Sequence, residues 1–447
     1  MKRFLYIFVG LIAVGMIGCK KDPEVTKSSV AQLSTFSFAK NDSMPGLAKA
    51  VFTIEERLAT DTGLVWNKDS MLYGTRLDSV VPKFTFAATP SAVMLSTPLR
   101  DSISLSGYDT LDFSQGPIYL TITSQDGTNT KTYEIRPSVH QADPDLYRWS
   151  QLFGGFAAQE DCEQRVVEQG SDFVLFANNG FAISVYRSAD GATWSGPDAV
   201  SGLPAGTKVR QIISDGTTLY YGQGNAVYTS TDATTWTANT TSYSVVTMLL
   251  YWNERAWALT GENEDYELAY MDGTTLTLSG LKPENSMFPV SDFATVTFQS
   301  PSLRDRAMII GGFAENGLSL NTRWNLEYSE HIEGQYRMQE FSIDRPSFTA
   351  LTGVSVISYN DQLLMFGGVD ADMTYFGRDI LISMDEGLNW TKADTAKNQL
   401  PAVYKARQKQ TAIVRNNNIY LFGGQDQTTT YSDVYCGRLN SIEWEKK

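Results

Sequence analysis

The chain has 447 residues, of which 42% are hydrophobic and 12% aromatic, and its formal net charge is -14. A chain this long predicts more than one domain, and its negative charge argues against nucleic acid or anionic lipid as the main partner. Charged residues are few, and the apolar residues alternate rather than follow a helical period, which predicts an all-β protein with a sizeable core.

The first eighteen residues have the composition of a targeting segment. Lys2 and Arg3 precede an apolar stretch that is too short for a membrane-spanning helix. The stretch ends in Met16-Ile17-Gly18-Cys19, which resembles a bacterial lipobox, with Met16 where Leu is usual. That resemblance implies that residues 1–18 are a lipoprotein signal peptide and that Cys19 is lipidated. An ordinary signal peptide or a chance cysteine is the alternative.

Residues 19–33 are polar and are expected to form a flexible tether behind the lipidated cysteine. Lys20, rather than Asp, follows the cysteine, and by resemblance to lipoprotein sorting rules this suits the outer membrane. No later stretch is apolar enough to span a bilayer. We therefore expect an outer-membrane lipoprotein that is anchored by lipid only and faces either the cell surface or the periplasm.

Residues 34–138 are expected to form a first domain of short, half-buried strands. Asp126-Gly127 is a hairpin signal between the last two strands. Together with Asp112-Phe113-Ser114, this segment resembles the Ig-like modules that open many Bacteroidota lipoproteins, which implies a β-sandwich that serves as a stalk or spacer. The expected strands are residues 35–38, 50–54, 83–86, 103–105, 118–122 and 131–135.

Residues 139–447 are expected to form a β-propeller, because strand patterns recur at roughly 40 to 60 residues, the size of a four-stranded blade. Six blades account for these repeats, and Trp149 could belong to a seventh blade. Residues 145–152 are a leading strand that could help to close the ring. Paired first and second strands are expected at 164–168 with 173–177, 209–214 with 218–222, 245–252 with 255–260, 294–298 with 307–312, 354–359 with 362–368, and 410–415 with 418–424.

Three glycine pairs end second strands of these repeats, as in kelch and galactose-oxidase-like propellers. A glycine pair permits a backbone turn and a close approach of blades that a Cβ would block. The pairs are Gly311-Gly312, Gly367-Gly368 and Gly423-Gly424.

Three Ser-x-Asp segments ending in Trp resemble the Asp-boxes of sialidase-like propellers. The carboxylate is expected to accept backbone N–H bonds within the turn while the Trp packs between blades. In families that carry these boxes they are structural and lie away from the ligand face. The boxes contain Asp190 and Trp194, Asp232 and Trp236 with Ala233 in place of the usual glycine, and Asp385 and Trp390; Trp444 marks the outer strand of the last blade.

Long loops between the second and third strands of the last three blades are the expected ligand face. Their aromatic rings could stack on sugars, and their Asp and Arg side chains could bind hydroxyls or carboxylates. Trp324 and Tyr431 could instead begin third strands and pack in the core. The candidate ligand-binding residues are Arg323, Trp324, Asp370, Asp372, Tyr375, Phe376, Arg378, Asp426 and Tyr431.

Catalytic chemistry has little support in the sequence. The only two histidines are His140 and His331, too few for most histidine-based metal centres or triads. Carboxylates such as Asp370 with Asp372, or those within 262–267, could serve acid–base chemistry or Ca²⁺, but such runs are more often solvated loops. We therefore expect no catalytic residues, no metal and no cofactor.

Cys162 and Cys436 fall in the first and last expected blades, which are neighbours in a ring. A disulfide between them could staple the closure in an oxidising compartment, but two separate thiols are the favoured alternative because spacing cannot show proximity.

The whole chain resembles a Bacteroidota lipoprotein family with an Ig-like module followed by a kelch and Asp-box propeller. The expected function is non-catalytic binding of a glycan or a protein on the propeller loop face, by a monomer or a member of an envelope complex. The alternatives are a carbohydrate-active enzyme, either a glycosidase or a lyase, and a structural subunit of an outer-membrane complex.

Overall fold

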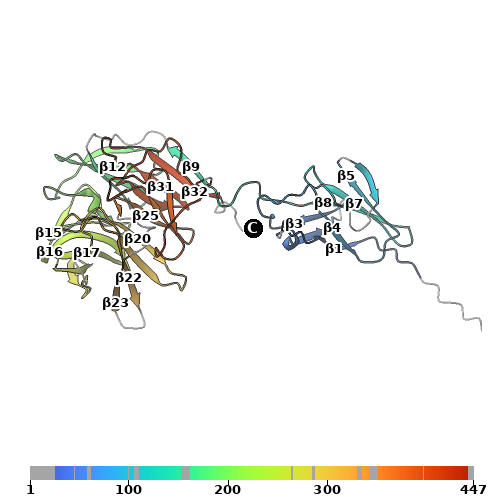
Figure 1. Cartoon of the computed structure of the whole chain (residues 1–447), viewed down its shortest axis with the longest axis horizontal. Helices are drawn as coiled ribbons and strands as arrows, with labels where there is room; N and C mark the ends of the chain where they lie inside the picture. Colours follow the sequence, from blue (N-terminus) through green and yellow to red (C-terminus); the bar gives the residue numbers. More distant parts are fainter. Residues whose placement is uncertain are drawn as a thin grey trace, which may run out of the picture. The chain divides into compact units, whose positions relative to one another are not determined.

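The computed structural model divides into two compact units, residues 1–143 and 144–447, which are described separately. Figure 1 shows the strands of both units. Among the described residues, no helix is long and apolar enough to cross a membrane. The lipobox and Cys19 lie outside the described residues, which are 26–44, 46–57, 62–98, 100–104, 110–152, 162–262, 265–283, 287–329, 335–342, 351–395 and 397–440.

The first unit is built from two sheets. A mixed sheet has the strand order β2-β3-β8-β7-β5-β6, with β3 and β8 parallel, and a second sheet pairs β1 with β4. The six expected strands are present, whereas β3 and β5 were not predicted. The bounds are β1 (Leu33–Phe38), β2 (Phe52–Glu55), β3 (Thr62–Asn67), β4 (Pro82–Phe86), β5 (Ala92–Thr97), β6 (Arg100–Ser104), β7 (Ile118–Thr123) and β8 (Thr130–Arg136), with a short 3₁₀ turn η1 (Leu47–Lys49).

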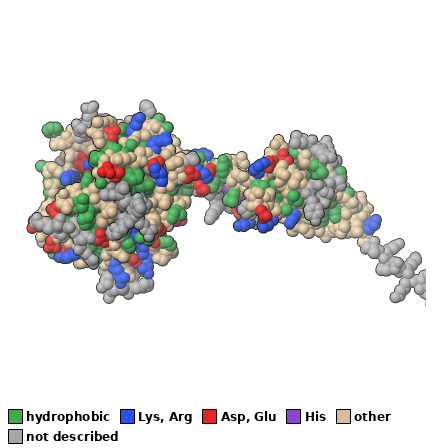
Figure 2. Space-filling view, viewed as in Figure 1, with side chains coloured by type: hydrophobic (Ala, Val, Ile, Leu, Met, Phe, Trp, Pro, Cys, Tyr) green, Lys and Arg blue, Asp and Glu red, His purple; other side chains and the backbone are tan. Residues whose placement is uncertain are grey.

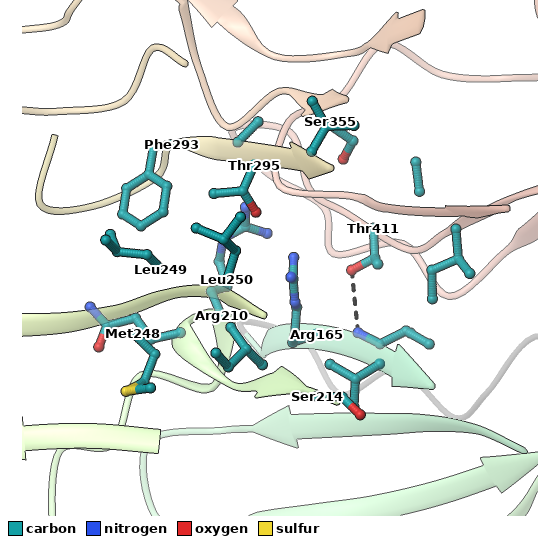
Figure 3. A pocket seen from close by; sticks show the side chains of 18 of the residues that line it. Arg165, Arg210, Ser214, Met248, Leu249, Leu250, Phe293, Thr295, Ser355 and Thr411 are labelled. Carbon is teal, nitrogen blue, oxygen red and sulfur yellow. Dashed lines mark hydrogen bonds between the residues drawn. The ribbon is translucent and has the colours of Figure 1, made fainter. Parts of the chain in front are cut away.

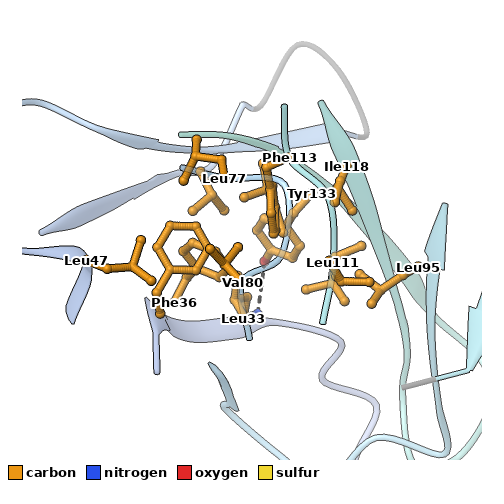
Figure 4. Packing of buried hydrophobic residues seen from close by; sticks show 14 of the residues in the cluster. Leu33, Phe36, Leu47, Leu77, Val80, Leu95, Leu111, Phe113, Ile118 and Tyr133 are labelled. Carbon is orange, nitrogen blue, oxygen red and sulfur yellow. Dashed lines mark hydrogen bonds between the residues drawn. The ribbon is translucent and has the colours of Figure 1, made fainter. Parts of the chain in front are cut away.

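Both sheets of this unit contribute side chains to one apolar core, shown in Figure 4. Tyr133 of β8 is buried there, and its hydroxyl accepts a hydrogen bond from the backbone N–H of Leu33 at 3.2 Å and donates one to Glu56 at 2.6 Å. Burial first, and then the Glu56 carboxylate, raises the pKa of Tyr133 to about 12. Two sheets over a shared core fit a sandwich, and the immunoglobulin-like topology stays a prediction.

The second unit consists of antiparallel strands that fall into consecutive groups. Four sheets of four strands have the orders β10-β11-β12-β13, β20-β21-β22-β23, β25-β26-β28-β29 and β30-β31-β32-β9. The sheet β14-β15-β16-β17-β18-β19 contains two groups, because the first half of β16 pairs with β15 and the second half with β17. This makes six groups, although two of them share continuous strands, so the six-blade count itself stays a prediction.

The strand bounds of the second unit follow the expected repeats closely, and they are β9 (Tyr147–Leu152), β10 (Glu163–Gln169), β11 (Asp172–Asn178), β12 (Ile183–Ser188), β13 (Ser195–Ala199), β14 (Ile213–Ser214), β15 (Leu219–Ser230), β16 (Thr237–Trp252), β17 (Arg255–Glu262), β18 (Asp265–Asp272), β19 (Thr275–Leu278), β20 (Ala294–Gln299), β21 (Asp305–Ile310), β22 (Thr322–Ser329), β23 (Gln335–Ser342), β24 (Leu351–Thr352), β25 (Ser355–Tyr359), β26 (Gln362–Phe366), β27 (Val369–Asp370), β28 (Ile380–Ser383), β29 (Thr391–Lys392), β30 (Thr411–Arg415), β31 (Asn418–Phe422) and β32 (Val434–Leu439). A 3₁₀ turn, η2 (Val209–Gln211), precedes β14.

The ring is closed by the first strand of the unit. β9 lies antiparallel to β32 in Figure 1, with Val434 opposite Leu152 and Leu439 opposite Tyr147. The leading strand at 145–152 therefore closes the ring as the outer strand of the last group. Trp444 was expected to mark that outer strand; the strand is β9 instead, and Trp444 lies outside the described residues.

The glycine pairs sit where neighbouring groups touch. Gly312 has φ +90°, and a Cβ there would lie 2.6 Å from the carbonyl oxygen of Ser291 and 2.8 Å from Phe293 Cβ. Its N–H donates to Leu351 O at 2.9 Å, in the segment that leads to the next group. The positive φ and this close approach both require glycine.

The Asp-box turns have the expected local hydrogen bonds. Asp232 Oδ1 accepts from the N–H groups of Thr234 and Thr235 at 2.9 and 2.7 Å, and Trp236 Nε1 donates to Ala233 O at 3.1 Å. Asp190 and Asp385 accept equivalent bonds in the other two boxes. Ala233 takes a φ of +62° in the place of the usual glycine, so the degenerate box keeps the same turn.

Candidate functional site

The loop that leaves β31 is held by one buried guanidinium. Arg407, which is 1% exposed, pairs with both carboxylate oxygens of Asp433 and donates to Gly423 O at 3.0 Å. Its Cζ lies 3.9 Å from the centroid of the Tyr431 ring. Burial alone would lower the pKa of Arg407, but the Asp433 carboxylate raises it above its usual value. Arg407 therefore fixes the conformation of the last long loop.

Three of the predicted ligand-binding residues come together on this face. Tyr431 donates a hydrogen bond to Asp426 Oδ2 at 2.5 Å, and the Asp426 charge also bears on Tyr375 in the neighbouring loop. All three side chains are partly exposed. Burial, and then the hydrogen bond to Asp426, raises the pKa of Tyr431 to about 12, so its hydroxyl stays protonated at neutral pH. Tyr431 is therefore not a core residue, and the aromatic and carboxylate groups form a small polar patch.

Arg323 and Trp324 do not belong to that patch, which corrects the sequence-based expectation. Both are 1% exposed, and Trp324 packs among the apolar residues between the third and fourth groups. Arg323 donates to Glu386 O at 2.5 Å in the Asp-box turn of the next group. Burial lowers the pKa of Arg323 to about 10. These side chains join groups of strands and cannot meet a ligand.

The remaining candidate residues either lie in turns at the surface or pack against the apolar core. Asp370 caps its own loop by accepting from the N–H groups of Asp372 and Thr374 at 3.0 and 2.8 Å, and Asp372 is exposed. Arg378 donates to Gln399 at 2.7 Å. Phe376 packs against the apolar cluster of β25 and β26, so it supports the fold as well as the loop.

A central channel with a volume of about 740 Å³ lies beside this loop face. Sequence reasoning did not predict it as the site, although the channel is lined by the inner strand of each of the six groups (Figure 3). The inner strands begin on the side where the long loops emerge. Gln408 and Gln425 exchange two backbone hydrogen bonds of 2.9 Å, and Lys409, the next residue, lines the channel. The mouth of the channel is therefore continuous with the loop face.

An ion network spans the mouth. Asp292 Oδ1 lies 3.3 Å from Arg210 Nε, and its Oδ2 lies 3.0 Å from Lys409 Nζ. Arg210 also donates to Lys409 O at 2.6 Å. Glu163 accepts the N–H of Val209 at 3.0 Å, and burial, opposed by the Arg210 charge, leaves its pKa raised. The network joins the first residue of β10 to the segments just before β14, β20 and β30 around the opening.

Deeper in the channel, Arg165 of β10 points into the open space (Figure 3). Burial first, and the positive charge of Arg210 second, lower its pKa to about 10, so it remains a cation at neutral pH. The hydroxyl-bearing Ser214, Thr295, Ser355 and Thr411 line the same channel. In the sequence, Arg165 is distinguished only by being a charged residue within an expected inner strand.

The described residues contain no cluster of three or more His, Cys, Asp and Glu side chains that could hold a metal ion. His331 lies outside the described residues. Cys162 and Cys436 are free thiols in the structure, and burial raises the pKa of each. Figure 2 shows acidic and basic side chains interspersed over the visible surface of the second unit, without a single-sign patch.

Two family models match the chain and together span nearly all of it. A model described as the DUF6242 β-propeller domain matches residues 143–447, and one described as the N-terminal domain of the same domain of unknown function matches residues 24–136. A solved propeller, described as the structure of YjhT, is 14% identical over 63% of this chain and 96% of its own, with a TM-score of 0.46. No curated protein gives a significant match.

Proposed function

Because the chain belongs to the DUF6242 family and its second domain is a β-propeller, we propose that this propeller is a non-catalytic module that binds a saccharide at the mouth of its central channel. The observation that carries the proposal is the channel itself. Its volume of about 740 Å³ falls within the range of small-ligand sites, which is roughly 300–1,000 Å³.

The lining favours a polar ligand of sugar size over a flat protein surface. Hydroxyl groups from several inner strands can bond to sugar hydroxyls, and the fixed ion network gives the mouth a defined shape. The adjoining patch of Tyr375, Asp426 and Tyr431 offers partly exposed rings and a carboxylate to further units of a chain that leaves the channel.

The proposed location is the outer membrane, with the chain held by a lipid on Cys19 and the first unit serving as a spacer. The support for this is the lipobox-like segment Met16–Cys19 and the polar residues that follow it. Mass spectrometry of Cys19 in the membrane fraction tests it: a diacylated N-terminal cysteine supports the proposal, and an unmodified cysteine would refute it.

A carbohydrate-active enzyme is the second candidate, and Glu163 is the observation that favours it. Its buried carboxyl has a raised pKa, and the Asp292 charge is among the causes. A carboxyl whose pKa is raised, beside a second carboxylate, is the type of pair that glycosidases use for acid–base catalysis. A saccharide whose turnover is lost in Glu163→Gln would establish that function.

The test is a glycan array probed with residues 24–447, followed by a turnover assay on every glycan that binds. Saturable binding without turnover, weakened about two- to tenfold by Thr295→Val in the channel, supports the binding module, because a hydrogen bond inside a site is worth roughly 0.5–1.5 kcal/mol. If the folded protein binds no glycan, the saccharide proposal is refuted and a protein becomes the favoured ligand. Thr240→Val, on the strand β16 outside the channel lining, is the matched control.

A further inference from the structure

The central channel contains a desolvated cation, Arg165, that has no counter-ion among the described residues. Arg165 makes no hydrogen bond or ion pair with any residue in the described parts of the chain, and its Nε is buried without a partner. By contrast, Arg210 and Lys409 at the mouth share Asp292. A desolvated, unpaired guanidinium destabilises a fold, so its presence calls for a ligand that compensates it.

The charges of the channel are distributed unevenly along its axis. In the half next to the loop face, the basic residues Lys208, Arg210 and Lys409 lie at the mouth and Arg165 lies below them, and Asp292 and Glu163 are the acidic residues. Glu168 and Asp215 lie at the other end of the inner strands. The half of the channel next to the loop face is therefore net positive in a chain whose net charge is -14.

A hydroxyl group near Arg165 is free to complete an anion site. Thr411 accepts the N–H of Val166, the residue next to Arg165, at 3.2 Å (Figure 3). Because that bond uses the Thr411 oxygen as acceptor, its own proton remains available for a ligand. A guanidinium and a hydroxyl donor together match the acceptors of a carboxylate or a phosphate group.

We propose that Arg165 anchors an oxyanion-binding subsite in the channel, so that the ligand of the propeller carries a carboxylate, as in a sugar acid, or a phosphate group. The inference rests on the proposed saccharide site and narrows it to acidic ligands. In this subsite, Lys208 and Arg210 attract the anion to the mouth of the channel, and Arg165 binds it.

The experiment compares ligands that differ only in the oxyanion. The melting temperature of residues 24–447 is measured with glucuronate and galacturonate, with glucose and galactose as neutral partners, and with inorganic phosphate. The acids are expected to raise the melting temperature and the neutral sugars to do so at concentrations at least about tenfold higher, because a charge-assisted bond is worth roughly 1.5–3 kcal/mol. A phosphate response that exceeds the response to the acids would identify the phosphate group as the ligand feature.

Arg165→Gln is the test variant and Arg148→Gln the control, since Arg148 is an exposed arginine on β9 that does not line the channel. Arg165→Gln is expected to abolish the oxyanion response while leaving the melting temperature of the unliganded protein unchanged or raised, because it removes an uncompensated charge. Arg165→Lys should restore part of the response. A lower unliganded melting temperature with an unchanged oxyanion response would overturn the inference.

The outcomes for the two proposals differ. Neutral sugars that bind as well as the acids, in wild type and Arg165→Gln alike, would overturn the oxyanion subsite and leave the saccharide module standing. A phosphate response that disappears in Arg165→Gln, with no response to any sugar, would support the subsite and refute the saccharide ligand. No response to any of these probes would refute both.

Discussion

Replacement of Arg407 by Met tests whether one buried ion pair orders the loop face. The substitution keeps the length of the side chain but removes the pairing with Asp433, the bond to Gly423 O at 3.0 Å and the contact with the Tyr431 ring at 3.9 Å. Breaking a buried pair by removing one partner costs about 3–5 kcal/mol, because the other charge, here the mostly buried Asp433, loses its partner. We expect a loss of that size in the free energy of unfolding.

The assay is urea unfolding followed by tryptophan fluorescence. Of the nine Trp residues only Trp66 belongs to the first unit, so the signal reports the propeller. A cycle with Asp433→Asn separates the ion pair from packing: the double variant should be more stable than the sum of the single losses predicts, by at least about 1 kcal/mol. Arg148→Met, at an exposed position, should change stability by less than about 0.5 kcal/mol. An Arg407→Met loss below about 1 kcal/mol, or an additive cycle, would refute the reasoning.

Three further predictions concern the fold. Gly312→Ala should destabilise the propeller by at least about 2 kcal/mol more than Gly317→Ala in urea unfolding, since both have positive φ but only Gly312 faces backbone atoms; equal losses would mean that φ alone matters. The backbone N–H bond from Thr235 helps to lower the pKa of Asp232 to about 2, so Asp232 stabilises the fold above its ordinary pKa, and this stabilisation is lost as pH falls through about 2. The stability difference between wild type and Asp232→Ala should therefore narrow with acid; a constant difference contradicts this. Gly437→Val should expose β9 to limited proteolysis, because a Cβ at this position would lie 2.3 Å from Trp149; uncleaved β9 would contradict it.

Local patterns were predictable because their physics is local. An Asp-box is a carboxylate bonded to N–H groups two and three residues ahead, so Asp232 could be identified from the sequence alone. The leading strand was also predictable, since the strand that contains Trp149 is not followed by the other strands of a blade. The spacing of the repeats also assigned the outer strand of the last group to Trp444. Spacing alone cannot show that β9, from the start of the unit, takes that position beside β32.

The candidate site was predicted only in part. Tyr375, Asp426 and Tyr431 do share a face, because loops that follow equivalent strands emerge on the same side of a ring. Trp324 was misplaced because a large aromatic residue at the start of a strand packs inward or outward according to its neighbours in the next group. Arg165 was missed because no local pattern distinguishes a charge that faces a channel from one that faces solvent.

The closure of the ring by β9 has a consequence for folding order. Ser150 and Cys436 meet across the closing pair although they are 286 positions apart in sequence. Such pairing has a high contact order, so it forms late and slowly, and it cannot form on a ribosome until the last strand has emerged. The edge of β32 stays unpaired until then and could recruit another chain. A second copy that donates its own β9 would satisfy the same edge, which makes strand exchange between chains the characteristic misfolding hazard of this propeller.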